Sequence, residues 1–251
     1  MRTAMVSDDL RVATWNIHDA KGSDGVRNVT RVGVVVRQLR QLGVPLIGLQ
    51  EVACGPSAGN EVAELAHGNG YHWSAIPTHG HRSTKQYGNA LLSSTPADSV
   101  HIHDLSIAGR EPRGALETRF CWQGHRLRVV VTHLGLRAGE RRLQVDRLLA
   151  LLGREPGVTT VLLGDINEWL LWGRPLRWLH RRFGNSPSVR SFPTFLPVFA
   201  LDRIWIDRPW AMRTIGSFRT PESSHASDHL PVVATLRFPA TSKESTIRSL
   251  G

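Results

Sequence analysis

Runs of consecutive apolar residues alternate along this chain with segments in which apolar residues recur at helical spacing. Between residues 28 and 42 the apolar positions fall three or four apart, and Gly43 follows, so the pattern predicts a helix that ends there. This helix lies between two short apolar runs, residues 11–17 and 45–50, which predict buried strands. A strand–helix–strand order of this kind is typical of a parallel strand pair with a covered face.

The same reading continues to residue 238. It predicts further helices at residues 61–67 and 139–152, the second with an apolar face of leucines. It predicts further strands at residues 71–76, 88–93, 100–105, 115–122, 127–132, 160–163, 201–206 and 230–238. Three of these strands follow one another closely and predict an antiparallel meander, so the sheet should be mixed. The apolar face of the 139–152 helix is assigned to Leu143, Leu148, Leu149, Leu151 and Leu152.

No internal repeat and no linker divides the chain, which favours one α/β domain over residues 1–251, with a core at about 10–238 and loose termini. No apolar run approaches the roughly 18–20 residues that a membrane span needs. The N-terminus has no apolar stretch of signal-peptide length. We therefore expect a cytoplasmic monomer. Cys54 and Cys121 cannot form a disulfide framework and are predicted to be buried spacers.

The charge balance adds a constraint on the partner. The net charge is +10 and the sequence pI about 11.0, and only 3 of the 31 basic residues are lysine. Arginine favours bidentate contact with phosphate, so a basic surface suits nucleic acid, anionic lipid or a phosphorylated small molecule. A genome that favours arginine codons would explain the Arg/Lys ratio equally well, but it would not explain the net charge.

Polar side chains gather where the predicted strands end. Because α/β folds assemble sites where apolar strands terminate at one edge of a sheet, we expect these side chains to converge. Five strand ends contribute, and Asp202 lies at the start of a further strand. The residues at the five ends are Asn16, Glu51, His133, Asp165 with Asn167, and Asp228 with His229.

This set of side chains favours one kind of chemistry. Carboxylate and amide oxygens suit a hard ion such as Mg²⁺ or Mn²⁺, and Mg²⁺ commonly shares its coordination sphere with phosphate. One imidazole can donate to a phosphate oxygen, and another, oriented by a carboxylate, can take a proton from water. The sequence contains no P-loop, dinucleotide fingerprint, nucleophile elbow or HExxH motif. The pairs His79/His81 and His101/His103 lack further zinc ligands and are assigned to the surface or the framework.

Seven short blocks together resemble the signature motifs of the endonuclease/exonuclease/phosphatase superfamily, whose members include DNase I-like nucleases, sphingomyelinases and inositol-phosphate phosphatases. Each block is weak by itself, but all seven occur in the right order between about residues 11 and 237. The blocks are Thr14-Trp-Asn-Ile17, Leu49-Gln-Glu-Val52, Gly88-Asn-Ala-Leu-Leu-Ser93, Val131-Thr-His-Leu134, Gly164-Asp-Ile-Asn167, Leu201-Asp-Arg-Ile204 and Ser227-Asp-His-Leu-Pro231.

The resemblance implies a four-layer α/β sandwich, with two mixed sheets packed face to face and helices outside. It also implies dependence on a divalent metal, usually Mg²⁺. By position, Glu51 would be the principal metal ligand, with Asn16 beside it and Asp228 as a second carboxylate on the metal side. Asp202 would orient His229 as general base or electrostatic partner.

The resemblance assigns the remaining residues to the substrate. Asp165 and Asn167 would hold the attacking water or the phosphate, and His133 would contact the phosphate. We also expect three further residues near the substrate phosphate: His18, Asn89 and Arg113. For Arg113, a salt bridge that stabilises its turn is an equally good interpretation.

Departures from the family pattern bear on the substrate. DNA-repair members carry an acid where this chain has His18 and a tyrosine where it has His133, and their long basic insertions are not evident. Three blocks are similar to a bacterial subgroup of unsettled substrate. We therefore expect a phosphodiesterase acting on a lipid or small phosphorylated substrate. The Trp- and Arg-rich residues 169–183 suggest peripheral contact to an anionic membrane, although tryptophans packed in the core beside a solvated basic helix would explain this segment at least as well. A Mg²⁺-dependent nuclease is the alternative, and a binding module without activity is a third reading.

Overall fold

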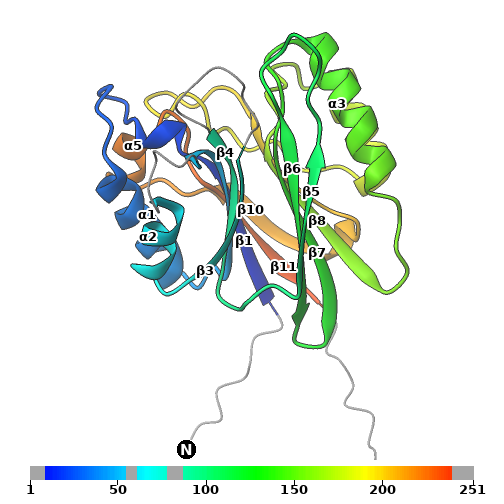
Figure 1. Cartoon of the computed structure of the whole chain (residues 1–251), viewed down its shortest axis with the longest axis horizontal. Coiled ribbons are helices and arrows are strands. Elements are labelled where there is room, and N and C mark those ends of the chain that lie inside the picture. Colours follow the sequence, from blue (N-terminus) through cyan, green and yellow to red (C-terminus); the bar gives the residue numbers. More distant parts are fainter. Residues whose placement is uncertain (1–8, 55–60, 78–86, 239–251) are drawn as a thin grey trace, which may run out of the picture.

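The computed structural model describes residues 9–54, 61–77 and 87–238. Two β-sheets pack face to face, and helices cover the outer face of each sheet, which gives the four layers seen in Figure 1. Helices α1, α2 and α5 lie on one side of the sheets and α3 on the other (Figure 1). The predicted four-layer α/β sandwich is confirmed.

The first sheet has six strands, and only β1 and β2 run parallel in it, as the opening strand–helix–strand pattern predicted. The edge strand β10 was not predicted, because it is a short, mostly exposed strand without a buried apolar stripe. The order in the sheet is β10 (Met212–Ser217), β11 (Val232–Arg237), β1 (Asp9–Asn16), β2 (Leu46–Ala53), β4 (Tyr87–Ser93) and β3 (His72–Pro77).

The second sheet has five strands. Its first three form the predicted antiparallel meander, β7 and β8 are parallel, and β9 returns antiparallel to β8. The order is β5 (Ser99–Asp104), β6 (Gly114–Trp122), β7 (His125–His133), β8 (Val158–Asp165) and β9 (Asp202–Ile206).

The helices begin and end where local chemistry dictates. The helix α1 (Val29–Gln41) starts at Asn28, whose side chain accepts a hydrogen bond from Arg31 N, and Gly43 follows it with a φ of +77°. None of the helices within the described residues is both long and apolar enough to cross a membrane. The others are α2 (Glu61–His67), α3 (Ala138–Leu151), α4 (Arg174–Phe183) and α5 (Ser223–Ala226), with the 3₁₀ turns η1 (His18–Ala20) and η3 (Pro209–Ala211).

Three apolar clusters hold the layers together. One lies between the sheets, a second joins α1, α2 and α5 to the first sheet, and a third joins α3 and α4 to the second. The sheets approach so closely that a Cβ on Gly48 would lie 2.0 Å from Leu163 Cδ1. Because both faces of the central strands are covered, their sequences are continuous apolar runs rather than alternating patterns.

Two expectations were wrong. Leu143 and Leu151 of α3 are exposed, and the buried face of that helix instead includes polar residues such as Arg141 beside Leu148. Cys121 is exposed rather than buried, since it lies on the solvent side of β6, and Cys54 is partly buried. The expected loose termini and the His79/His81 pair fall outside the described residues.

Candidate active site

Strand register brings three of the predicted side chains together at one edge of the second sheet. His133 and Asp165 are partners on the parallel strands β7 and β8, and Asp165 is the partner of Asp202 on β9. Gly164 permits this approach, because a Cβ there would lie 1.8 Å from Thr132 O. Neighbouring strands lie about 4.8 Å apart, so side chains at one register position can interact directly.

The facing sheet contributes Glu51 through an irregularity in β2. The pairing of β2 with β4 shifts register between Leu49 and Val52, and Glu51 adopts a φ of +56°. A non-glycine residue at positive φ is strained, and such strain and bulges concentrate at functional sites, where they redirect a side chain. The irregularity sends the Glu51 carboxylate toward Asn16 at the end of β1, whose amide lies 3.0 Å away.

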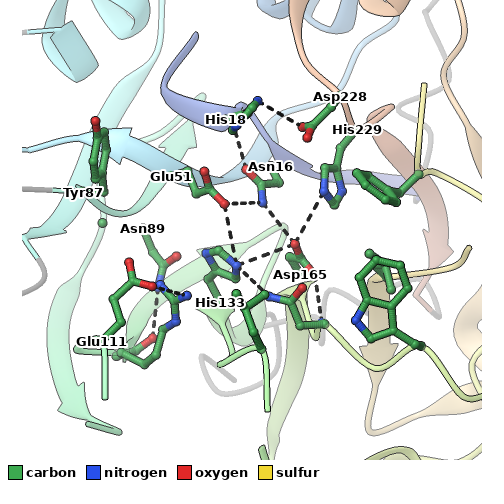
Figure 2. Close-up of a pocket in the computed structure, with 18 residues that line it drawn as sticks. Asn16, His18, Glu51, Tyr87, Asn89, Glu111, His133, Asp165, Asp228 and His229 are labelled. Carbon is green, nitrogen blue, oxygen red and sulfur yellow. Dashed lines mark hydrogen bonds and ion pairs between the residues drawn. The ribbon is translucent and has the colours of Figure 1, made fainter. Parts of the chain in front are cut away.

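These residues line a pocket of about 360 Å³. Figure 2 shows the side chains of Asn16, Glu51, His133, Asp165 and His229 pointing toward one another in it. Of the eleven residues predicted for the site, ten line the pocket, while Asp202 lies behind it and is fully buried. The ten are Asn16, His18, Glu51, Asn89, Arg113, His133, Asp165, Asn167, Asp228 and His229.

Asn16 connects two carboxylates. Its Nδ2 donates to Glu51 Oε1 and to Asp165 Oδ2, each at 3.0 Å, while its Oδ1 accepts from His18 N at 3.0 Å. Burial raises the pKa of Glu51, and the nearby charge of Asp165 adds to this increase, although the hydrogen bond from Asn16 opposes it. The protein therefore holds two carboxylates close together at an electrostatic cost.

His229 and Asp202, 27 residues apart, form the predicted dyad: His229 Nδ1 lies 2.8 Å from Asp202 Oδ2. Ser191 Oγ donates to the same carboxylate oxygen at 2.5 Å, and the Phe192 ring lies 4.7 Å from the imidazole. Burial by itself would lower the pKa of His229, but the charge and hydrogen bond of Asp202, with Asp165 and Asp228 nearby, raise it to about 10. His229 is therefore an imidazolium at neutral pH in the metal-free protein.

His133 has the opposite character. Burial and the positive charge of Arg113 lower its pKa to about 3, so the ring is neutral at pH 7. Its Nε2 lies 2.9 Å from Asn167 Nδ2, which also donates to Leu134 O at 2.8 Å. Asn167 is in turn positioned by Asp165, whose Oδ1 accepts from Asn167 N at 2.8 Å. The two pocket imidazoles thus differ in charge, as distinct chemical roles require.

The other wall of the pocket carries groups suited to an anion. Arg113 is buried; its Nη2 bonds Glu111 at 2.9 Å, while its Nε has no hydrogen-bond partner among the described residues. Both interpretations of Arg113 are therefore compatible with its position, since it forms a salt bridge and lines the pocket.

The other two residues expected near the phosphate also have partners. Asn89 donates to Gly114 O at 2.9 Å, and His18 Nδ1 lies 3.5 Å from Asp228 Oδ1.

Several pocket residues were not assigned a role from the sequence. Tyr87, Glu111, Trp169 and Phe192 line the pocket, and Ser191 bonds the buried dyad. Trp169 stood in the Trp- and Arg-rich segment 169–183, which the sequence connected with a membrane surface rather than with the pocket, and Phe192 had no assigned role. Ser191 carried no signal, because a serine in a loop has many uses and only the tertiary contact distinguishes this one.

The donor set fits a divalent cation. Glu51 and Asp165 converge on one amide nitrogen, and Asp228 also lines the pocket. Hard oxygen donors of this kind suit Mg²⁺ or Mn²⁺. Potential ligand atoms of Asp165, Asp202 and His229 also lie within 4.8 Å of one another, but Asp202 and His229 are already hydrogen-bonded to each other. In the orientation observed, Asn16 presents its N–H groups to the carboxylates, so ligation through its oxygen would require the amide to rotate.

The raised pKa of His229 predicts how the stability of the metal-free protein depends on pH. The folded pKa of about 10 exceeds the ordinary histidine pKa of 6.5, so the stabilisation is complete below about pH 6.5 and is lost as pH rises through 10. The free energy of unfolding, measured with urea in EDTA, should decrease as the pH rises from about 6.5 to 10. This decrease should be a few kcal/mol larger for the wild type than for His229→Gln. Equal slopes for the two proteins would contradict the assigned ionisation.

Comparison with known proteins agrees with the geometry. A model of the Endonuclease/Exonuclease/phosphatase family matches residues 13–229. The chain is 32% identical over 177 residues to the uncharacterized protein YbhP of Escherichia coli K12, covering 66% of this chain and 67% of YbhP. A crystal structure of an endonuclease/exonuclease/phosphatase from Beutenbergia cavernae is similar with a TM-score of 0.75 and 24% identity, covering 91% of this chain and 71% of that one.

A mannosyl-6-phosphatase of Bacteroides thetaiotaomicron, Bt3783, shares the fold with a TM-score of 0.72 and 16% identity, over 91% of this chain and all of that one. The family model covers nearly all of the two sheets, and the motif residues that it spans are those that converge in the pocket. The chain belongs to the endonuclease/exonuclease/phosphatase family.

Proposed function

We propose that this protein is a metal-dependent phosphoester hydrolase, and more specifically a phosphodiesterase that uses Mg²⁺ or Mn²⁺ and acts on a lipid or small phosphorylated substrate. The observation that carries the proposal is one pocket in which Glu51 and Asp165 share the amide of Asn16 beside the Asp202–His229 dyad. A metal-ligand set and a proton-transfer pair in one place are the parts that hydrolysis of a phosphoester requires.

Glu51, Asp165 and Asp228 would hold the cation. When bound, it would lower the pKa of a water molecule and neutralise charge that develops on the phosphate. Its positive charge would also offset the carboxylates that raise the pKa of His229, and so favour the neutral imidazole that a base requires. As a charged imidazolium His229 would serve as an electrostatic partner of the phosphate, and as a neutral imidazole it would serve as the general base.

In the proposed reaction, the water oxygen forms a bond to phosphorus as the ester P–O bond breaks. His229 Nε2, turned toward the pocket by the bond from Nδ1 to Asp202, takes a proton from this water. The leaving alkoxide takes a proton from solvent water and departs as an alcohol, and the His229 imidazolium then returns its proton to solvent. Asp202 stabilises the imidazolium that forms, and Ser191 holds Asp202 in place.

The substrate phosphate would lie between the dyad and the opposite wall. The unpartnered Nε of Arg113 is a buried donor available to a phosphate oxygen, and Asn89 lines the same wall. Neutral His133, held by Asn167, lines the pocket without adding charge. Donors placed before the reaction stabilise charge that develops on the phosphate.

A nuclease is the second candidate, and the net charge of +10 is the observation in its favour. The pocket rim is less favourable to it. Leu136 and Trp169 line the opening, where a nuclease would be expected to track a phosphate backbone with cationic groups. The two candidates use the same chemistry and differ only in the substrate that binds at the opening of the pocket.

A substrate screen tests the proposal. The purified protein, with Mg²⁺ and with Mn²⁺, should release product from at least one phosphodiester among small chromogenic diesters, phospholipids and plasmid DNA. Activity should disappear in EDTA and return with excess cation. Hydrolysis of no phosphoester by folded, metal-supplemented protein would refute the proposal and leave a binding module; cleavage of DNA alone would select the nuclease.

A further inference from the structure

Large exposed apolar side chains lie beside the pocket. We define the apolar rim as the exposed apolar side chains of residues 169–172 and 195–199. Trp172 is 68% exposed, Phe195 77% and Leu196 62%. Single exposed apolar residues are ordinary on protein surfaces, but a cluster of large ones beside a pocket marks an interaction site.

Ring contacts connect the rim to the catalytic dyad. The centroid of the Trp169 ring lies 4.8 Å from that of Phe199 and 5.7 Å from that of Phe192, and Phe192 packs on His229 at 4.7 Å. The Trp169–Phe199 contact joins the two segments of the rim, and backbone hydrogen bonds between Phe192 and Phe199 hold the second segment beside the ring that packs on the dyad. The apolar surface is therefore continuous from the dyad out to solvent.

A buried ion pair anchors the first segment of the rim. Arg141 of α3 is 3% exposed; its Nε donates to Glu168 Oε2 at 3.2 Å, and its Nη1 donates to Leu136 O. Glu168 Oε1 accepts from Leu170 N at 3.2 Å, at the start of the rim. Because the backbone of this segment is anchored, its apolar side chains stay exposed to water. Burial of these side chains against a partner would therefore be favourable.

The charge around the rim selects the partner. Residues 166–200, all of them described, contain five arginines and a single acid, Glu168, which is buried and paired with Arg141. Arg174 follows the rim directly, Arg190 precedes its second segment, and both are exposed. Tryptophan, phenylalanine and leucine bordered by arginine match an anionic bilayer, where rings and apolar side chains enter the headgroup region and guanidinium groups meet lipid phosphates.

We propose that the apolar rim docks on the surface of an anionic phospholipid bilayer and that the pocket then receives a phosphoester headgroup from that surface. The second half rests on the proposed function, whereas the docking itself requires no turnover. A bilayer accounts for the two observations together: an apolar surface lies beside a polar pocket, and exposed arginines adjoin both of its segments in the sequence.

The test uses the full chain and sucrose-loaded vesicles, either of phosphatidylcholine alone or with about 30% phosphatidylglycerol. In EDTA, the wild type should sediment with the anionic vesicles, with a blue shift of tryptophan fluorescence, and should be released by high salt. The variant Phe195→Ser/Leu196→Ser, altered only at exposed positions, should bind at least about tenfold more weakly, since it lacks two large apolar side chains that would enter the headgroup region. Trp210→Ala, an exposed tryptophan in η3, is the matched control and should bind as the wild type does.

Each outcome is decisive. Absence of binding to anionic vesicles, or equal binding by the rim variant and the wild type, would overturn the proposal. So would a dimer of the wild type in light scattering that the rim variant abolishes, because the rim would then be covered by a second copy. Hydrolysis of a small water-soluble phosphodiester should be equal in the rim variant and the wild type. If the wild type binds the anionic vesicles but hydrolyses no phosphoester, the proposed function is refuted and the proposed docking surface still holds.

Discussion

Replacement of Glu51 by glutamine should lower kcat/KM for phosphoester hydrolysis by more than about 100-fold, because loss of a group outside the coordination sphere already costs 10- to 100-fold in metal affinity or activity. Glu51 is the carboxylate that the irregular backbone of β2 directs into the pocket, 3.0 Å from Asn16. Glutamine keeps the shape and the hydrogen-bonding reach of the side chain and removes its charge. The loss should therefore appear first as weaker cation binding.

Calorimetric titration of Mn²⁺ and activity at rising Mg²⁺ measure this loss separately from folding. Because burial raises the pKa of Glu51, removal of its charge should leave the thermal midpoint of the metal-free protein unchanged or higher. Glu64→Gln, on the exposed side of α2, is the matched control and should retain full activity. Normal Mn²⁺ affinity in Glu51→Gln would remove this residue from the proposed metal site.

His229→Ala should reduce kcat by about 10³-fold, in the range of 10²–10⁴ that positioned acid–base groups contribute. Asp202→Asn should produce a loss of similar order, because the amide cannot stabilise the imidazolium and supports the wrong tautomer. The two losses should not add in the double variant, since both residues act as one unit through the 2.8 Å hydrogen bond.

The pH dependence distinguishes this role from a structural one. Asp202→Asn should move the pKa of His229 downward, because the charge of Asp202 is the largest of the contributions that raise it. The ring resonances of His229, followed by NMR in the metal-free protein, report that pKa directly. His225→Ala, an exposed histidine four residues away, is the control and should leave kcat and the pH profile unchanged. Additive losses, or an unchanged pKa in Asp202→Asn, would contradict the dyad.

The sequence by itself determined the layers of this fold and most of its pocket. Continuous apolar runs such as residues 160–163 required strands covered on both faces, and the polar residues that end those runs had to meet at a sheet edge. Motif order then identified partners that spacing could not, such as Asp202 for His229. Ten of the predicted residues line one pocket. Three of them, Asn16, His133 and Asp165, are the last residues of β1, β7 and β8, strands whose register the core enforces.

Only the tertiary structure decided which apolar residues are core and which are surface. Leu143 satisfied the helical period but is 53% exposed, while the charged Arg141 on the same helix is buried, because Glu168 from a distant loop neutralises it. Ser191 and the rim around Trp172 likewise depend on which segments lie beside them. A local pattern records the preference of each residue for water or interior, whereas burial follows from the partners that the folded chain provides, and these come from distant parts of the sequence.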